Sequence, residues 1–369
     1  MENILPWFIL KSVPGIGNHL FKRLIERFNS PENVFEASGK DLLEIKGITP
    51  RLVTVIKHHK IRDSVKKDFD LVMKKGYKIV TLSDTDYPPL LLQIPDPPPF
   101  LYVFGRLNGS FKNIAVVGSR NATDYGISTT RRLCKDLALL KMTIVSGMAI
   151  GIDSAAHQGA LMGNGNTIAV LGSGLEFVYP AENRKLFHVI AENGAVISEF
   201  PLLTEPEPHN FPIRNRIISG ISLGTVVVEA TKRSGSLITA RLSAEQNREV
   251  FAIPGSIHSF KSTGTHTLIK QGAKLVEHAQ DIMEELSYAI KAPHEEDKTG
   301  NETMERISHL SSEEFLVFEA LGPYPLHIDD LARKLSMKPG KLSSILLQLE
   351  LKGTVLQSPG KLFSREAME

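Results

Sequence analysis

The sequence predicts an α/β fold in which an open parallel sheet forms the core and a small domain flanks it on either side. Two observations support this prediction. Short β-branched runs in the middle of the chain are each followed by glycine and then by a helical pattern, as in repeated β-α units. The chain has 369 residues, of which 42% are apolar, which suits two or three domains with buried cores and excludes disorder of the whole chain.

Composition excludes several classes of protein. The 43 Lys and Arg residues against 41 Asp and Glu give a formal net charge of +2, so the chain is not a polybasic tail protein. The start has no basic region before an apolar core, and no stretch approaches the roughly 18 apolar residues of a spanning helix. We therefore expect a soluble, cytoplasmic protein with no membrane contact. The single cysteine, Cys134, cannot form an internal disulfide or a thiolate metal site and is expected to be a half-buried helix residue.

Residues 1–80 are expected to form a small helical domain. Apolar residues recur at helical spacing over 20–28 and again over 52–56. Residues 13–17 (VPGIG) look like the turn of a helix-hairpin-helix, and 45–48 look like a degenerate second copy, as in a SAM-like domain. Such hairpins offer glycine N–H groups to a DNA phosphate and serve equally often as protein contacts, so both roles stay open.

Residues 81–112 are expected to be a proline-rich connection, because their clustered prolines cannot continue a helix. Residues 113–290 are expected to form a Rossmann-like domain. Its candidate strands have the continuous apolar character of parallel strands that are buried on both faces. They are 114–117, 143–145, 167–171, 195–197, 225–228 and 250–253.

The last part of the chain is expected to be a polar linker, 291–306, and a third domain, 307–369. The third domain has three helical patterns, then a strand, a Pro-Gly turn and a second short apolar run, at 312–320, 328–335, 338–352, 354–357, 359–360 and 362–363. This order favours a winged-helix-like domain. Lys338, Lys341 and Lys352 could contact duplex DNA, but a solvated basic face is the expected explanation.

The segment after the first strand of the sheet predicts a phosphate site. Gly118, Ser119 and Arg120 follow this strand directly, and Thr123 stands just before the next helix. Ligands bind at this edge of an open parallel sheet. Glycine lets backbone N–H groups approach a phosphate, the helix start adds partial positive charge, and arginine can bind two phosphate oxygens.

Two further strands end in similar loops. Ser146 and Gly147 lead into a tight turn, and Gly172 and Gly174 follow the third strand. A single loop of this kind can simply satisfy the geometry of a strand-to-helix turn. Three together, one of them carrying Gly-Ser-Arg, favour a ligand site.

Residues 209–220 place Arg214, Asn215 and Arg216 within one helical turn. Side chains two residues apart do not share a helix face, so one arginine can hold the fold while the other meets a ligand. Glu229 ends the fifth strand. Catalysis and pairing with one of these arginines are both open for this carboxylate, although a buried carboxylate beside arginine is usually structural.

Motifs of several enzyme classes are missing from the sequence. No Gly-x-x-x-x-Gly-Lys-[Ser/Thr] occurs, which argues against a P-loop ATPase. No Gly-x-Ser-x-Gly nucleophile elbow occurs, and the histidines form no zinc-binding pattern. We therefore expect no cofactor, no metal and no catalytic residue.

The middle of the chain closely resembles the DNA-processing protein A (DprA/Smf) family. The resemblance is strong over residues 80–290 and extends to the flanks by domain order. It is carried by motifs that occur in one order: Gly118-Ser119-Arg120, Thr123-x-Tyr125-Gly126, Ser146-Gly147-x-Ala149-x-Gly151-Ile152-Asp153, Leu171-Gly172-x-Gly174, Tyr179-Pro180-x-x-Asn183, Phe211-Pro212-x-Arg214-Asn215-Arg216, Val228-Glu229-Ala230, Ser234-Gly235-Ser236 and Ile253-Pro254-Gly255.

The resemblance implies a protein that binds single-stranded DNA without strong sequence preference, forms homodimers through its Rossmann-like domain, and helps to load the RecA recombinase in natural transformation and recombination. In the family the Gly-Ser-Arg loop contacts phosphate, which here implies Gly118, Ser119 and Arg120. A basic residue beyond the Tyr-Pro-x-x-Asn motif also contributes, here Lys185. Phe177 could stack on a base, and a near-neutral net charge is no obstacle, because binding depends on a local patch.

Two other functions stay open beside a non-enzymatic DNA-binding mediator. A nucleotide-binding or nucleotide-hydrolysing enzyme is suggested by Gly224, Thr225 and Glu229. It resembles the Rossmann-like nucleotide phosphoribohydrolases, although their usual Pro-Gly-Gly-x-Gly-Thr-x-x-Glu pattern is broken here. The third possibility is a structural scaffold whose flanking domains recruit partners.

Overall fold

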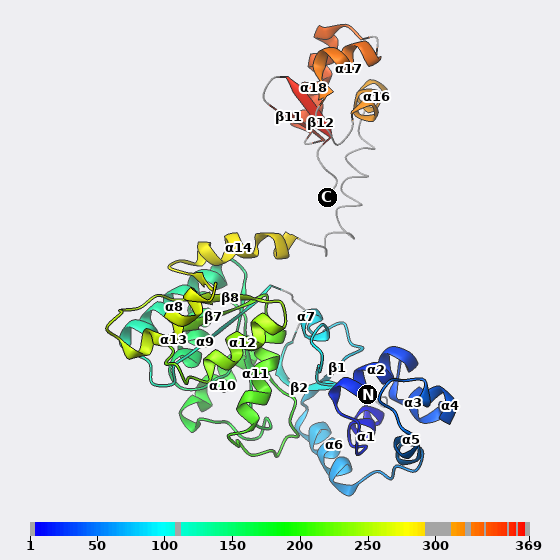
Figure 1. Cartoon of the computed structure of the whole chain (residues 1–369), viewed down its shortest axis with the longest axis vertical. Helices are drawn as coiled ribbons and strands as arrows, with labels where there is room; N and C mark the ends of the chain where they lie inside the picture. The colour runs from blue at the N-terminus through cyan, green and yellow to red at the C-terminus, as the bar shows by residue number, and fades with distance from the viewer. Residues whose placement is uncertain are drawn as a thin grey trace. The chain divides into compact units, whose positions relative to one another are not determined.

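The computed structural model describes residues 4–107, 112–291, 311–321, 326–335, 337–352, 354–358 and 361–365. The chain forms two compact units, residues 1–290 and 291–369 (Figure 1). The expected linker, 291–306, lies outside the described residues except for Lys291, the last residue of α14 (Ala279–Lys291). None of the helices in these ranges combines the length and hydrophobicity of a membrane-spanning segment.

Six helices open the first unit, and the two expected helix-hairpin-helix pairs are formed by the first and second and by the fourth and fifth of them. Ser30, Ser38 and Thr49 each accept a hydrogen bond from the N–H three residues later and so start a helix. Phe8 stacks on Phe100 at 4.5 Å between ring centroids, which joins the helices to the sheet. The helices are α1 (Leu5–Lys11), α2 (Asn18–Phe28), α3 (Pro31–Glu36), α4 (Gly39–Leu43), α5 (Pro50–Lys57) and α6 (Asp63–Lys75).

The described part of this unit contains one nine-stranded sheet, in the order β1-β2-β6-β5-β4-β3-β7-β8-β9. The strands from β6 to β9 in this order are parallel, whereas β1 and β2 are antiparallel to their neighbours. The strands are β1 (Lys78–Thr81), β2 (Phe100–Gly105), β3 (Asn113–Gly118), β4 (Thr143–Ser146), β5 (Thr167–Val170), β6 (Gly194–Ser198), β7 (Gly224–Val228), β8 (Glu249–Ala252) and β9 (Lys274–Leu275). The mostly parallel, Rossmann-like sheet is therefore confirmed.

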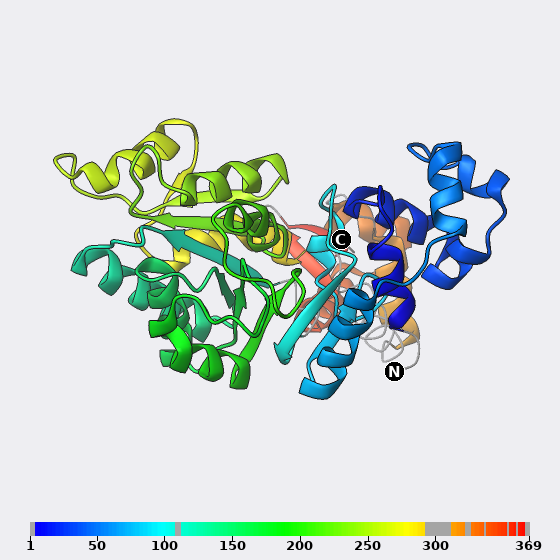
Figure 2. The same ribbon diagram turned by 90° about the horizontal axis from the view of Figure 1, so that it is seen from below.

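Segment 81–112 is more than the connection that its prolines suggest. Its described residues include α7 (Pro89–Leu92) and β2, and β2 pairs with both β1 and β6. The prolines stop before Phe100, so the apolar run that follows is free to donate its N–H groups to the sheet. Figure 2 shows the helices α1–α6 beside the β1–β2 end of the sheet.

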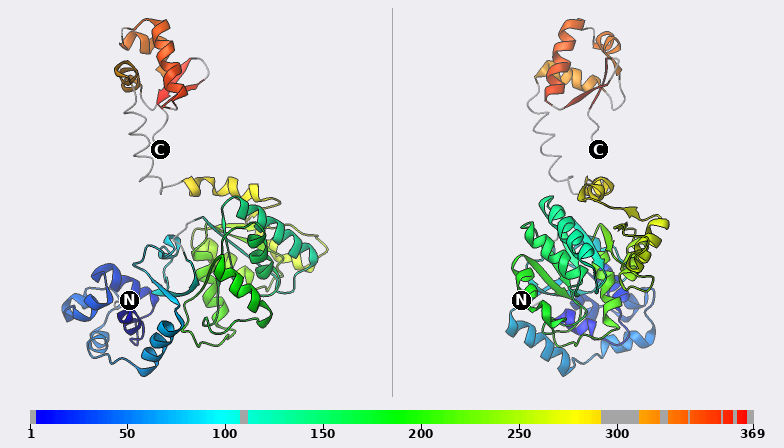
Figure 3. Two further views of the ribbon diagram at one scale, coloured as in Figure 1. Left: turned by 180° about the vertical axis from the view of Figure 1, so that it is seen from behind. Right: turned by 90° about the vertical axis from the view of Figure 1, so that its left-hand side faces the viewer.

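Helices cover both faces of the sheet (Figure 3). On one face α8 (Asp124–Leu139), α9 (Ile152–Met162) and α14 pack on Ile114 and Val116 of β3. On the other face α7, α11 (Asn210–Gly220) and α12 (Ser236–Glu245) pack on Ala115 and Val117. Both faces of β3 are buried, which explains its continuous apolar run. Cys134 of α8 is fully buried rather than half-buried, and this burial raises the pKa of its thiol.

The strand order produces a topological switch between β3 and β7. The chain passes from β3 to β6 in one direction across the sheet and then returns to β7 on the other side of β3. The helices that follow β3 and β7 therefore leave toward opposite faces and open a gap between their first turns. Ligands of open α/β sheets bind at such a point.

The second unit is a winged-helix domain, as predicted. α16 (Ser312–Ala320) begins with a capping box between Ser311 and Glu314 and is followed by β10 (Leu326–His327), α17 (Ile328–Leu335) and α18 (Pro339–Leu351). β11 (Val355–Ser358) and β12 (Leu362–Arg365) pair antiparallel, and β10 pairs with β12. The expected turn at 359–360 lies outside the described residues.

Candidate nucleic-acid interface

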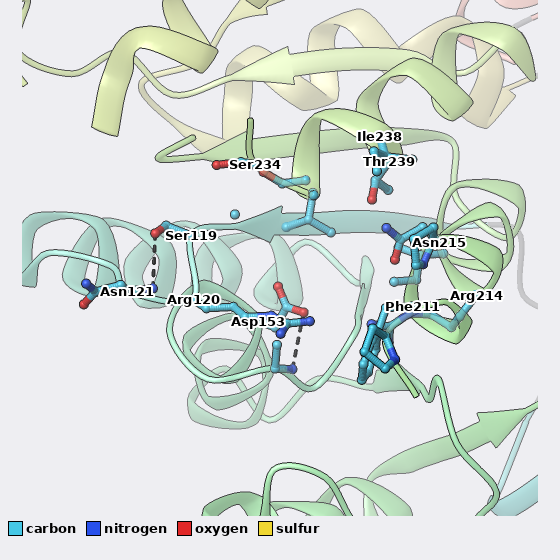
Figure 4. A pocket seen from close by; sticks show the side chains of 18 of the residues that line it. Ser119, Arg120, Asn121, Asp153, Phe211, Arg214, Asn215, Ser234, Ile238 and Thr239 are labelled. Atoms are coloured by element: carbon cyan, nitrogen blue, oxygen red, sulfur yellow. Dashed lines mark hydrogen bonds between the residues drawn. The ribbon is translucent and has the colours of Figure 1, made fainter. Parts of the chain in front are cut away.

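A cavity of about 650 Å³ lies at the switch point between β3 and β7 (Figure 4). Its walls are the loops after β3, β4, β5, β6 and β7 together with the start of α11 and of α12. A cavity of this size can hold a nucleotide or a short part of a longer ligand. The residues that line it include Gly118, Ser119, Arg120, Asn121, Asp153, Tyr179, Phe211, Arg214, Asn215, Thr231, Ser234, Ser236 and Thr239.

Arg120 is exposed and stacks on an aromatic wall of the cavity. Its guanidinium carbon lies 5.1 Å from the ring centroid of Phe211, and the ring of Tyr179 lies 5.9 Å from that of Phe211. Within the described part of the chain, Arg120 takes part in no ion pair. The positive charge and the neighbouring aromatic faces are therefore available to a ligand.

Arg214 is buried under the same cavity. It donates to the carbonyl of Gly147 at 2.8 Å and to that of Val170. Burial lowers its pKa to about 10, against the opposing charge of Asp153, so it is charged at neutral pH. Burial also raises the pKa of Asp153, which Arg214 counteracts. Position 147 requires glycine, because a Cβ there would lie 2.6 Å from the guanidinium nitrogens.

Some of the predicted loop residues support the cavity without lining it. A Cβ at Gly172 would lie 2.8 Å from the Phe211 ring, and a Cβ at Gly174 would lie 2.2 Å from the carbonyl oxygen of Leu202. Ser146 is buried and donates to the carbonyl of Val116 at 2.7 Å, which ties β4 to β3. A direct contact of these residues with DNA stays a prediction.

The start of α12 supplies hydroxyl groups to the cavity. Ser234 accepts the N–H of Thr231 at 2.9 Å. The hydroxyl of Ser236 is buried and has no hydrogen-bond partner among the described residues. A helix start attracts anions, because its first N–H groups are free and the helix dipole is positive there. This part of the wall can therefore bind an oxygen-rich anion.

Of the two roles left open for Glu229, pairing with Arg214 or Arg216 is wrong, because its carboxylate binds Thr123 instead. It accepts the N–H of Thr123 at 2.9 Å and also the Thr123 hydroxyl proton. Thr123 in turn accepts the N–H of Gly126 at 3.1 Å and so caps α8. The sequence could not show this, because the partner lies across the switch point and is not an arginine. Glu229 thus joins the loop after β7 to the start of α8.

Arg216 is the arginine that holds the fold. It forms an ion pair with Asp96 at 3.2 Å and another with Glu199, and it donates to the carbonyl of Asp96 at 2.8 Å.

Lys185 is exposed near the start of α10 (Arg184–Glu192), and Phe177 is half-buried. Neither of the last two lines the cavity, and their contacts with DNA stay predictions.

The predicted residues that line the cavity are Gly118, Ser119, Arg120, Arg214 and Asn215. Gly147 lines a small adjoining pocket of about 60 Å³ together with Arg120 and Arg214.

Sequence reasoning missed Phe211, Tyr179 and Asp153. Phe211 lies three residues before Arg214, so both are on one side of α11, and this spacing could have indicated it. Tyr179 and Asp153 had no such signal, because they reach the cavity from other strands.

The first hairpin pair is anchored within its own unit. Lys11 donates to the carbonyl of Glu199 at 2.9 Å. His19 lies 2.8 Å from the carbonyl of Pro95, and Lys22 donates to that of Leu92 at 2.7 Å. The flanks of this hairpin therefore contact protein. Gly47 in the second hairpin is exposed.

Comparisons with family models, with related sequences and with solved structures all identify the same protein family. Residues 78–287 match the family described as DNA recombination-mediator protein A, residues 302–361 match the DprA winged helix domain, and residues 9–57 match a SAM-like helix-hairpin-helix tandem. Protein Smf of Synechocystis is 34% identical over 97% of this chain and 98% of its own. Protein Smf of Escherichia coli is 40% identical over 81% of this chain and 80% of its own.

Two solved structures are also similar. DNA processing protein A of Streptococcus pneumoniae has 35% identity and a TM-score of 0.65, over 76% of this chain and 97% of that one. DNA processing protein A of Helicobacter pylori, whose structure concerns its binding of single-stranded DNA, has 30% identity and a TM-score of 0.51, over 58% of this chain and 97% of that one. The chain therefore belongs to the DNA recombination-mediator protein A (DprA/Smf) family, as its motifs predicted.

Proposed function

We propose that the cavity at the β3–β7 switch point binds single-stranded DNA. The observation that carries the proposal is the exposed guanidinium of Arg120, which lies 5.1 Å from the centroid of the Phe211 ring. A guanidinium binds phosphate oxygens, and an aromatic face stacks on any base. Neither interaction reads a base edge, so the proposed binding has little sequence preference.

The rest of the wall suits a phosphate chain. The buried charge of Arg214 lies below the cavity and is held in place by carbonyl groups, so it attracts an anion without moving. The start of α12 offers hydrogen-bond donors, among them the hydroxyl of Ser236, which has no partner in the part of the chain that the structure describes. Asn215 lines the same wall. A phosphate is thereby surrounded by donors from separate loops.

The wider role that we propose is that of a recombination mediator. A homodimer of this chain would hold the strand and help to load RecA onto it, in natural transformation or general recombination in the cytoplasm. Family membership supports this role, as does the H. pylori relative whose structure concerns single-strand binding. The protein would act by binding alone, without catalysis.

The binding proposal is tested with a fluorescent single strand of about 30 nucleotides and the matching duplex over a salt series. We expect a preference for the single strand, and we expect Arg120→Ala to weaken it about 10- to 100-fold. The slope of log affinity against log salt should fall by about 0.7 for one lost phosphate contact. Arg132→Ala, which removes an exposed arginine of α8 that does not line the cavity, is the matched control. Equal affinities of the Arg120 variant and the control would refute the proposal.

RecA loading is tested separately, by the lag before RecA covers a strand that is coated with single-strand binding protein. The whole chain should shorten this lag, and Arg120→Ala should not. An unchanged lag with a wild-type protein that binds DNA would reject loading and leave binding intact.

A second candidate function rests on Asp153. Its carboxyl group lines the cavity, and burial raises its pKa, as in many groups that transfer protons. A nucleotide-hydrolysing enzyme would use such a carboxyl group. Chromatography of nucleoside monophosphates incubated with the protein tests this: release of base by the wild type, lost in Asp153→Asn, would establish it. No release would reject it.

A further inference from the structure

Exposed hydrophobic side chains lie on the loop after β8, at the start of η2 (Phe260–Ser262) and at the start of α8, close to the loop that carries Arg120. Ile257 is 82% exposed, Phe260 is 68% exposed, and Tyr125 at the start of α8 is 52% exposed. We call these three residues the platform. They share an edge of the sheet with the cavity, because β3, β7 and β8 are parallel neighbours. Large exposed apolar groups that gather near a site indicate a binding surface.

Side-chain hydrogen bonds tie the platform to the loop after β3, which carries Arg120, and to the loop after β8. Lys261 donates to the carbonyl of Asn121, the residue after Arg120, at 2.6 Å. The Tyr125 hydroxyl donates to the carbonyl of Pro254 at 3.0 Å, and the Thr263 hydroxyl donates to that of Phe260 at 2.7 Å. The segment that carries Phe260 is therefore tied to Asn121, which lines the cavity.

Charge around the platform favours a nucleic acid over a protein as its partner. Lys232 and Arg233 are exposed in the loop after β7, and neither takes part in an ion pair among the described residues. Gly264, four residues after Phe260, donates its N–H to the carbonyl of Ala230, which brings the platform segment close to the loop that carries these two cations. Surfaces for single strands combine cations with aromatic rings.

We infer that a bound single strand continues from the cavity onto the platform. A base beyond those in the cavity stacks on Phe260, and its phosphates face Lys232 and Arg233. The inference rests on the proposed function and adds a second subsite to it, on a loop outside the residues that line the cavity. Strands long enough to reach this loop bind more tightly than strands that fill the cavity alone.

The test compares oligothymidylates of about 5 and about 15 nucleotides, the short one filling the cavity and the long one reaching the platform. Phe260→Ala should weaken binding of the long strand by about 5- to 100-fold and leave the short strand within about twofold. Arg120→Ala should weaken both lengths. Leu139→Ala is the matched control, since Leu139 is 58% exposed at the other end of α8.

A salt series distinguishes the contribution of the cations of the subsite from that of its aromatic ring. Exchange of both Lys232 and Arg233 for Gln should reduce the salt slope of the long strand by about 0.7 per lost phosphate contact, whereas Phe260→Ala should leave the slope unchanged.

Three results would overturn the inference. If Phe260→Ala behaves like Leu139→Ala with both lengths while Arg120→Ala weakens both, the platform is no subsite and the proposed function stands. If Phe260→Ala weakens both lengths equally, Phe260 belongs to the cavity. If the wild type binds neither strand, the proposed function and the inference fail together.

Discussion

The sheet edge and the winged-helix unit both carry cations, but they use them differently. In the winged helix, Lys352 pairs with Glu314 at 2.7 Å and Lys341 pairs with Glu313, so both charges are satisfied between α16 and α18. At the sheet edge, Arg120 is exposed over an aromatic ring. The charges of these two lysines are thus offset within their own unit, whereas Arg120 forms no ion pair in the described part of the chain.

Two arginines at the sheet edge differ in the same way: Arg214 supports the cavity, and Arg120 is the proposed DNA contact. Arg214 is almost fully buried and is held by carbonyl groups, whereas Arg120 is exposed. The comparison therefore predicts that substitutions below the cavity change stability, that substitutions at its mouth change DNA binding, and that those in the winged helix change little.

Arg214→Met should give the largest effect. It leaves Asp153 and two carbonyl groups without their buried partner, which typically costs about 3–5 kcal/mol of unfolding free energy. We expect this loss in the urea transition of the first unit and none in that of the second. Lys338→Met should change either transition by no more than about 0.5 kcal/mol. An Arg214 variant as stable as the wild type would show that this arginine is not an anchor.

Acid should destabilise the first unit through His157. This histidine is fully buried, with Nδ1 2.6 Å from the Thr167 hydroxyl, and burial lowers its pKa to about 3. In the unfolded chain His157 binds a proton near pH 6.5, whereas in the folded chain it stays neutral down to about pH 3. The unfolding free energy therefore falls as the pH drops from 6.5 toward 3, by up to about 1.4 kcal/mol per pH unit.

Urea titrations of wild type and His157→Gln between pH 7 and pH 4.5 measure this contribution. The difference in stability between the two should shrink as the pH falls. Parallel pH profiles would mean that His157 binds its proton in the folded protein at the same pH as in the unfolded chain, which would contradict the prediction.

Phe211→Leu tests the mouth of the cavity without changing its charge. Loss of a stacking face should cost about 1–3 kcal/mol of single-strand affinity. The salt slope should stay the same, because no phosphate contact is removed. Anisotropy over a salt series measures both quantities. An affinity equal to that of the wild type would place the bases elsewhere.

The smallest effect is expected from the double exchange of Lys341 and Lys352 for Gln. Lys341, Glu313 and Lys352 are exposed, and the buried Glu314 keeps the N–H of Ser311 as a second partner, so the second unit should lose no more than about 1 kcal/mol of unfolding free energy for each pair. Single-strand affinity should not change. A large loss of affinity would move the site, or part of it, to the winged helix.

Much of this fold follows from local patterns in the sequence. The strands from β3 to β8 are apolar runs that end in glycine or in a turn, and each predicted strand is present at its expected place. β2 was not predicted from the sequence, because its six residues follow a proline cluster that is typical of a connecting segment. β9 has only two exposed residues and leaves no pattern to detect.

The site was less predictable than the fold, because remote partners decide the role of each residue. Arg214 and Arg216 are alike in the sequence, yet one meets the carbonyls of two neighbouring strands and the other meets Asp96 and Glu199. Glu229 binds a threonine that lies 106 residues away along the chain. Such contacts depend on the strand order, which no local pattern specifies.

Photo-crosslinking of a 4-thiothymidine oligonucleotide to the whole chain, mapped by mass spectrometry, tests the central claim most directly. We predict crosslinks in the peptides that contain Tyr179 and Phe211, and their loss in Arg120→Ala. Crosslinks confined to residues 291–369 or to the first hairpin would contradict the account.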